Sequence, residues 1–348
     1  MEKNKLLNVA LSIIVVALVV YILKTLKTIF IPLTFALFLS LLFAPLVRFL
    51  ENKKFPKFLI IITLVLIIFI TFNGIGTVVY TSVASFSKNF PKYEEKITQA
   101  MQNVIYKLEI PKESLKDYIQ NKINWLDIAN KLSLSKTITG TMGSFITFFI
   151  NLLLTIIFMI FIVQERSIIF DRIYKVITEA HKRKSIKLLE RMEKQVGKYI
   201  VSKTIISLIT GGVGMFFVKI YGIDFVVISG LLLFILNYIP SLGSFIASAF
   251  PIIISMVEYG LGWQTFAISI SLVSLQIAMG NIVEPKIMGS GLSLSPLVIL
   301  ISLIFWYWIW GPVGMILAIP ITSAINIMIR EVPSLRVFSA IISSETKS

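Results

Sequence analysis

An ionisable group stands inside an apolar part of the chain. Glu284, Pro285 and Lys286 follow the polar residues Gln276 and Asn281, between two stretches that are each long enough to cross a bilayer. A carboxylate in a membrane segment is costly and usually faces a bundle interior or a water-filled cavity, so it indicates a functional site. Proline disfavours helical geometry at the preceding residue and has no N–H to donate. We therefore expect the helix to break at Glu284.

Two interpretations of Glu284 stay open from the residues alone. In the first, Glu284 projects into the helix bundle and exchanges a proton for a cation, since only one of them can neutralise the carboxylate at a time. In the second, Glu284 and Lys286 lie in water at a cytoplasmic helix end. We expect the other acidic residues nearby, Asp224 and Glu258, in short loops at the membrane edge.

Two further breaks interrupt the apolar C-terminal half, at 237–244 and at 310–314. Short apolar segments interrupted by Pro and Gly indicate discontinuous or re-entrant helices, which surround the binding sites of many secondary transporters. For 310–314 we favour an ordinary turn at the membrane surface, because tryptophans surround it. The candidate substrate contacts are Glu284, Asn281, Gln276, Asn237, Ser241 and Lys286. The candidate breaks or hinges are Pro240, Gly243, Pro285, Gly289, Pro296, Gly311, Pro312, Gly314 and Pro320.

Composition agrees with a membrane protein. Hydrophobic residues make up 56% of the chain and charged residues 15%, against about 25% charged in ordinary soluble domains. The chain has no cysteine, which excludes disulfides, thiolate nucleophiles and cysteine-ligated metals. The net charge of +15 does not indicate nucleic-acid binding, because the basic residues flank apolar spans, as membrane topology requires.

The apolar segments that must position the candidate contacts and breaks have the length needed to cross a hydrocarbon core of about 30 Å. They lie at 6–23, 29–50, 58–83, 140–163 and 204–221, and a continuous apolar region follows at 225–329. With the N-terminus inside, the short cytoplasmic regions hold 20 basic residues and the short outside loops hold 3. Short loops set orientation, so we expect both termini in the cytoplasm and residues 84–139 outside.

Two extramembrane segments have the period of amphipathic helices. One is 84–139; the other is the basic segment 164–203, which either lies along the cytoplasmic leaflet or packs on its neighbours as a solvated helix. The expected organisation is N-terminal membrane helices (1–83), an extramembrane segment (84–139), a membrane helix (140–163), a basic cytoplasmic segment (164–203), a C-terminal membrane domain (204–329) and a cytoplasmic tail (330–348).

No enzyme signature stands out. Gly211, Gly212 and Gly214 lack the preceding strand and the following Lys-Ser/Thr of a phosphate loop, and small residues in a span more often allow close helix approach. His181 lies in a highly charged stretch and is typical of a solvated histidine. We expect no catalytic residues, no metal site and no cofactor.

The C-terminal motifs resemble those of the autoinducer-2 exporter (AI-2E) family of bacterial membrane proteins. The matching residues, in family order, are Asn237, Pro240, Gly243, Glu284-Pro285, Gly289, Leu292-Ser293-Leu294-Ser295-Pro296, Trp310-Gly311-Pro312-Val313-Gly314-Met315 and Ala318-Ile319-Pro320. The resemblance implies an all-α integral inner-membrane permease with about eight membrane helices and broken or re-entrant segments in its C-terminal half.

The resemblance leaves the substrate open between a small sugar-like signal and Na⁺ or Li⁺ exchanged for protons. Asn, Ser and Gln side chains suit a polar solute, whereas a cation/proton exchanger needs a titratable carboxylate, for which Glu284 is the leading candidate. We expect a secondary exporter of a small polar molecule or monovalent cation in the lipid bilayer, with a homo-oligomer as an open possibility. The alternative is a membrane scaffold or regulator that binds a partner through 84–139.

Overall fold

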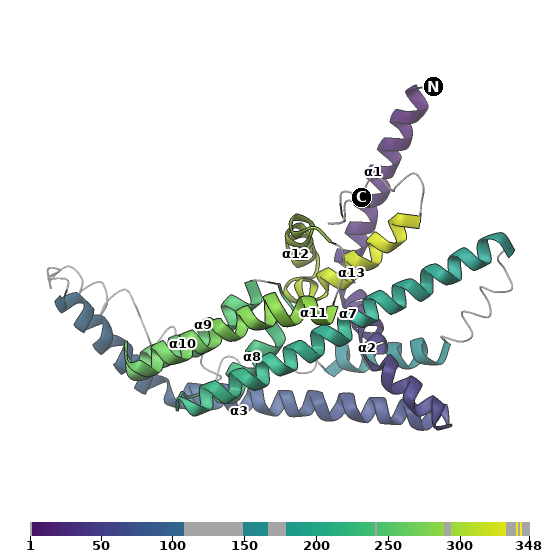
Figure 1. Cartoon of the computed structure of the whole chain (residues 1–348). Coiled ribbons are helices and arrows are strands. Elements are labelled where there is room, and N and C mark those ends of the chain that lie inside the picture. The colour runs from purple at the N-terminus through teal and green to yellow at the C-terminus, as the bar shows by residue number, and fades with distance from the viewer. Residues whose placement is uncertain are drawn as a thin grey trace. The chain divides into compact units, whose positions relative to one another are not determined.

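The computed structural model describes residues 2–107, 149–165, 179–240, 242–288 and 294–331, together with Ser339 and Ile342. Regular structure in these ranges is helical throughout, and they contain no strand. Six of the described helices are long and apolar enough to cross a membrane, and shorter apolar helices accompany them. The predicted all-α membrane class is confirmed (Figure 1).

The N-terminal helices are α1 (Glu2–Thr25), α2 (Lys27–Asn52) and α3 (Lys57–Lys107), and a further helix spans Phe149–Glu165. The spans expected at 6–23 and 29–50 lie in α1 and α2. The expected boundary between a span at 58–83 and a separate helix after it is wrong, because α3 runs through both for 51 residues. Pro91 lies inside α3, where the loss of one N–H donor does not end the helix.

Helix α7 (Glu179–Ile220) is 42 residues long. It joins the basic segment 164–203 to the span at 204–221, so the expected boundary between them falls inside one helix. A membrane-spanning stretch within it runs from Glu190 to Ile220. The C-terminal half continues with α8 (Val226–Leu236), α9 (Leu242–Tyr259) and α10 (Trp263–Ile277), then a π-helical stretch η1 (Ala278–Val283) and α11 (Glu284–Met288). It ends with α12 (Pro296–Trp310) and α13 (Pro312–Glu331).

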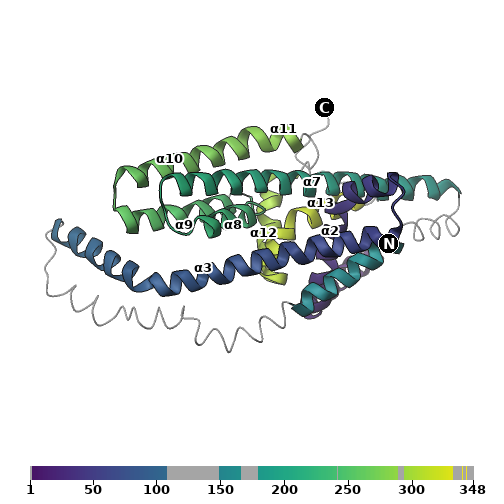
Figure 2. The same ribbon diagram turned by 90° about the horizontal axis from the view of Figure 1, so that it is seen from below.

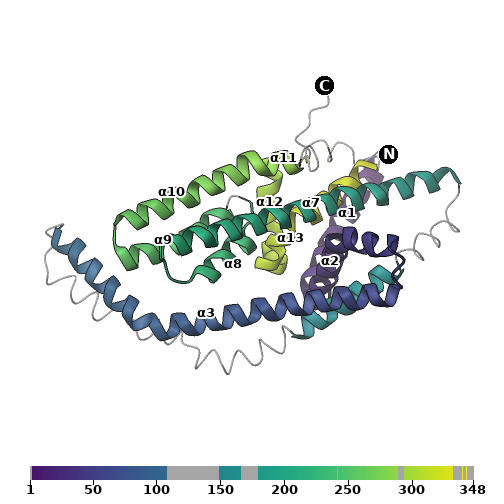
Figure 3. The same ribbon diagram turned by 60° about the horizontal axis from the view of Figure 1, so that its bottom comes forward.

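The chain forms two compact units. One contains residues 1–65, 150–203 and 287–348; the other contains 66–149 and 204–286. In the first unit α12 packs along α13 (Figure 3). Buried side chains of α7 and α13 form an apolar cluster with Leu294, and Ile342 packs against this cluster.

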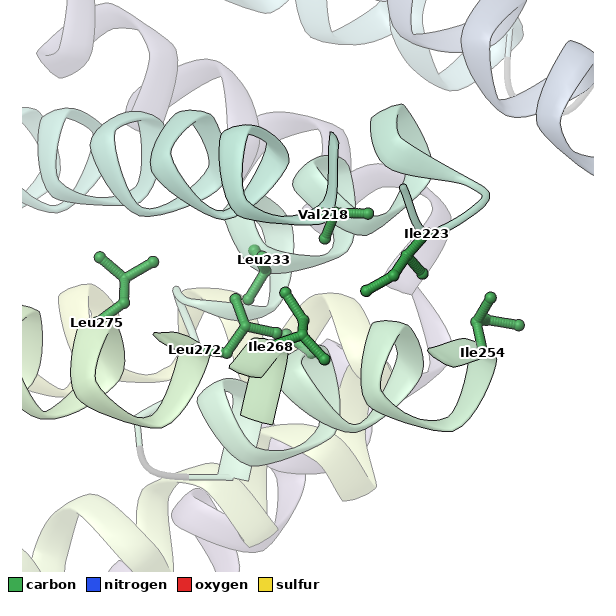
Figure 4. Close-up of a cluster of buried hydrophobic side chains, with 8 residues drawn as sticks. Val218, Ile223, Leu233, Ile254, Ile268, Leu272 and Leu275 are labelled. Atoms are coloured by element: carbon green, nitrogen blue, oxygen red, sulfur yellow. The ribbon is translucent and has the colours of Figure 1, made fainter. Parts of the chain in front are cut away.

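In the second unit α8 and α10 both pack on α9. Their core is a cluster of apolar side chains that also includes residues from the end of α7 and from the loop after it (Figure 4). Its buried members are Val218, Ile223, Leu233, Ala247, Ile254, Ile268, Leu272 and Leu275. Each helix therefore turns one apolar face to this cluster, while other large apolar side chains are exposed, above all on α9 and α10.

The expected breaks meet different outcomes. The chain does turn at 237–240. It also turns at Gly311, which has φ +67° and is the single residue between α12 and α13. Pro296 and Pro312 are the first residues of α12 and α13. Breaks at Pro285, Gly314 and Pro320 are wrong, since these residues lie inside helices. Gly289 lies outside the described residues.

Candidate functional site

Helices α8 and α9 form a hairpin, and its first arm, α8, is too short to cross the membrane. The 11 residues of α8 are about 16 Å long, roughly half of a hydrocarbon core of about 30 Å. At the open end of the hairpin, the backbone N–H of Asp224 donates to the Glu258 carboxylate at 3.3 and 3.4 Å, and the Tyr259 hydroxyl donates to the Gly222 carbonyl at 2.7 Å. The two ends of the hairpin therefore lie together, which is the form expected of a re-entrant hairpin with α8 as its short arm, while α9 by itself has the length of a span.

The turn at the closed end of the hairpin depends on a glycine. The N–H of Leu242 donates to the Pro240 carbonyl at 2.6 Å and the N–H of Gly243 to the Ile239 carbonyl at 3.1 Å. A Cβ atom at Gly243 would overlap the carbonyl oxygen of Leu236, a backbone atom of α8 that cannot swing aside. Gly243, predicted as a break residue, thus permits the close approach of the two arms.

Polar side chains join this turn to α7. The Asn237 amide Nδ2 donates to Ser207 Oγ at 3.0 Å, and the Tyr238 hydroxyl and Thr204 Oγ1 are 2.7 Å apart. We call these four residues the turn cluster. Asn237 is 5% exposed and Ser207 is fully buried. Ser207 lies thirteen residues before the end of α7, or about 20 Å along the helix axis, so the cluster lies deep within the span.

The buried polar face of α7 continues beyond the turn cluster. Lys203, Ser207 and Thr210 recur at steps of four and three, the spacing of one helical face, and are 2%, 0% and 0% exposed. An ionisable residue in a membrane-spanning helix indicates a functional site. Lys203 was grouped with the basic cytoplasmic segment in the sequence analysis, and Thr204, Ser207, Thr210 and Tyr238 were not predicted. The signal that could have found them is this same spacing, in which polar residues repeat on one face of an apolar span.

Glycines bring α8 close to α7 below the turn. A Cβ at Gly211 would lie 2.8 Å from the carbonyl oxygen of Gly230 and 3.1 Å from Phe234 Cβ. Small residues that let two membrane helices approach are a recurrent packing device. Beside Gly230, the fully buried Ser229 hydroxyl has no hydrogen-bond partner within the described ranges. A buried hydroxyl is normally paired, so Ser229 adds an unsatisfied polar atom to the buried face of α8.

The other predicted contacts fall elsewhere in the second unit. Gln276 Nε2 donates to Ser248 Oγ at 3.3 Å, between α10 and α9. Asn281 and Lys286 are exposed and Glu284 is half-buried, on the helical stretch that follows α10. The predicted break at Glu284 is wrong: its backbone is helical, with φ −58° and ψ −49°, and its N–H donates to the carbonyl of Met279. Ser241 lies outside the described residues, and an approach of 284–296 to the turn cluster stays a prediction.

The sequence matches the family model described as "AI-2E family transporter" over residues 11–334. It is 30% identical over 308 residues to the "AI-2 transport protein TqsA" of Escherichia coli (strain K12), covering 87% of this chain and 86% of that protein. It is 28% identical over 347 residues to a Haemophilus influenzae protein that carries the name "Putative transport protein", covering 96% of each.

The matched region includes the whole second unit, most of the first unit, the α8–α9 hairpin and the Glu284 segment. Several apolar helices of spanning length make the chain a multi-pass membrane protein, and its relatives carry the names of transport proteins. The chain belongs to the AI-2E transporter family.

Proposed function

We propose that the protein is a secondary transporter of the bacterial inner membrane, with both termini in the cytoplasm, that exports a small polar molecule or a monovalent cation. The observation that carries this proposal is the turn cluster, in which a re-entrant hairpin ends on buried polar groups inside an apolar domain. Discontinuous helices that end at membrane depth are where many secondary transporters bind their substrates. The amide of Asn237 and the hydroxyls around it offer donors and acceptors to a polar solute.

Glu284 is the candidate coupling group of this transporter. It is half-buried at the start of the short helix α11, directly after the π-helical stretch η1. A carboxylate that is neutralised either by a proton or by a bound cation exchanges one for the other, which is antiport. Gln276 and Asn281 supply amide groups along the same stretch.

The test is a flux assay on the purified protein in liposomes, with Na⁺, Li⁺ and autoinducer-2 as separate probes, each with and without a pH gradient. We expect one of the three probes to cross faster than in protein-free liposomes, and a pH gradient to change its rate. The name of the relative TqsA contains AI-2, so autoinducer-2 is the first probe to measure. Flux of no probe under any gradient would contradict the proposal and favour a scaffold that binds a partner through 84–139.

A further inference from the structure

The stretch η1 differs from the helices on either side in its hydrogen bonding. The N–H of Glu284 donates to the carbonyl of Met279, five residues earlier instead of the four of an α-helix. A π turn of this kind holds one more residue than an α turn, and such turns occur frequently at functional positions. The ribbon nevertheless continues from α10 through η1 into α11 (Figure 2).

Packing does not force the π turn on this stretch. No residue of η1 is fully buried. A Cβ at Gly280 would meet no heavy atom within 4 Å in the described part of the chain. Asn281 and Ile282 are exposed. Met279 packs against the apolar cluster from the start of the stretch, so the open space for a change in hydrogen bonding lies on the side of Gly280, Asn281 and Ile282.

Pro285 gives the local reason for the π turn. In a regular α-helix its ring would clash with the carbonyl of the residue four positions earlier, Asn281, and it could not donate to that carbonyl. Widening the preceding turn relieves this clash while the helix continues. The ring of Pro285 thus favours the π turn, while the better hydrogen-bond geometry of an α-helix favours the α turn.

The two sides of the turn respond differently to a change of register. Before it, α10 is anchored by Ile268, Leu272 and Leu275 in the apolar cluster, and by the bond from Gln276 to Ser248. One residue of an α-helix corresponds to about 100° of rotation and about 1.5 Å of rise. If η1 became α-helical, the residues after it, including Glu284 and Lys286, would turn by this amount about the helix axis while α10 stayed in place.

We propose that η1 is a register switch, which alternates between π and α hydrogen bonding and thereby turns Glu284 toward different surroundings in the transport cycle. Both arrangements are continuous helices, and in the α form only the carbonyl of Asn281 lacks a helical donor, because Pro285 has no N–H. Such a two-state element is what a conformational cycle requires. The inference rests on the proposed transport function and names the part of the chain that moves in it.

The movement itself can be measured without knowing the substrate. The chain has no cysteine, so the pair Ile270→Cys and Ile287→Cys, at two exposed positions on α10 and α11, places spin labels before and after the turn. Electron–electron distance measurements in lipid nanodiscs, at acidic and at alkaline pH, should give two distance populations. A single population under both conditions overturns the proposal, even if the protein transports.

Deletion of Gly280 should remove the switch and leave the fold intact. The shortened stretch has the number of residues that an uninterrupted α-helix needs to keep α10 and α11 in their present register. We expect normal membrane insertion, an unchanged elution profile, one distance population and flux reduced to that of protein-free liposomes. The matched control is deletion of Gly212, which also has open space around its Cβ position but lies in regular α7, where the deletion turns half of the helix and should prevent folding.

Pro285→Ala is a second, independent variant. It removes the ring clash and restores an N–H donor, so it should also shift the stretch to one population and reduce flux. The proposal is wrong if the Gly280 deletion damages folding as much as the Gly212 deletion, or if either folded variant transports at the wild-type rate. If the wild-type protein carries no probe, the transport proposal fails and the distance populations alone decide on the switch.

Discussion

Ser207→Ala tests whether the turn cluster takes part in transport. Ser207 is fully buried, and its Oγ accepts the Nδ2–H of Asn237 at 3.0 Å. Without this acceptor the amide loses its partner on α7. A buried polar group left unpaired costs about 1–3 kcal/mol, whereas hydrogen bonds between membrane helices average about 0.6 and reach about 1.7 kcal/mol. We therefore expect Ser207→Ala to lower the free energy of unfolding by about 1–2 kcal/mol, which is a factor of roughly 5–30 in the unfolding equilibrium constant.

Ser255→Ala is the matched control within the same unit. Ser255 is also fully buried, and its hydroxyl lies 3.0 Å from Thr265 Oγ1. Thr265 keeps its bond to the Gly260 carbonyl at 2.8 Å when Ser255 is shortened. Both variants thus remove one buried hydroxyl, but only Ser207 contacts the re-entrant turn. We expect a fall in flux for Ser207→Ala and wild-type flux for Ser255→Ala.

The assay combines flux in liposomes, with the probe that the wild-type protein carries, and thermal unfolding in detergent. Ser207→Thr retains a hydroxyl at the same position and should recover part of the flux, which keeps the test informative if Ser207→Ala folds poorly. Equal flux loss in Ser207→Ala and Ser255→Ala would mean that only stability is being measured. Wild-type flux in a destabilised Ser207→Ala would refute a transport role for the turn cluster.

Three further predictions concern coupling, packing and orientation. Glu284→Gln keeps the shape of the side chain but fixes it in a neutral form, so flux should lose its pH dependence. Glu258→Gln still offers an oxygen to its backbone donor and should behave as wild type. An unchanged pH profile for Glu284→Gln would exclude the coupling role. Gly211→Ala should lower the unfolding temperature, because its methyl meets a backbone oxygen at 2.8 Å and overpacking costs about 1–3 kcal/mol. Gly212→Ala, in open space, should not lower it. A cysteine at position 181 should react only with cytoplasmic reagents, and labelling from outside would reverse the orientation.

The sequence predicted the membrane class and the first two spans because apolar length is a strong local signal. It missed how far α3 and α7 extend, since charge and composition change within a helix without ending it. Lys203 shows the same limit. Its position in the sequence placed it at the end of the basic segment 164–203, while its burial depends on the face of α7 to which it belongs. That face becomes visible only when Ser207 and Thr210 are taken together with it.

The two proline-containing breaks show why the same rule was right once and wrong once. At 237–240 the chain leaves helical geometry, and its polar groups find partners in Ser207, Thr204 and the turn itself. At Glu284 the helix persists, because a shift to a five-residue hydrogen bond accommodates Pro285. Within a bilayer a helix can end only where protein or water satisfies the freed backbone groups. A proline therefore ends a membrane helix where the fold supplies partners for the freed groups, as at 237–240, and leaves it continuous where the preceding turn widens, as before Pro285.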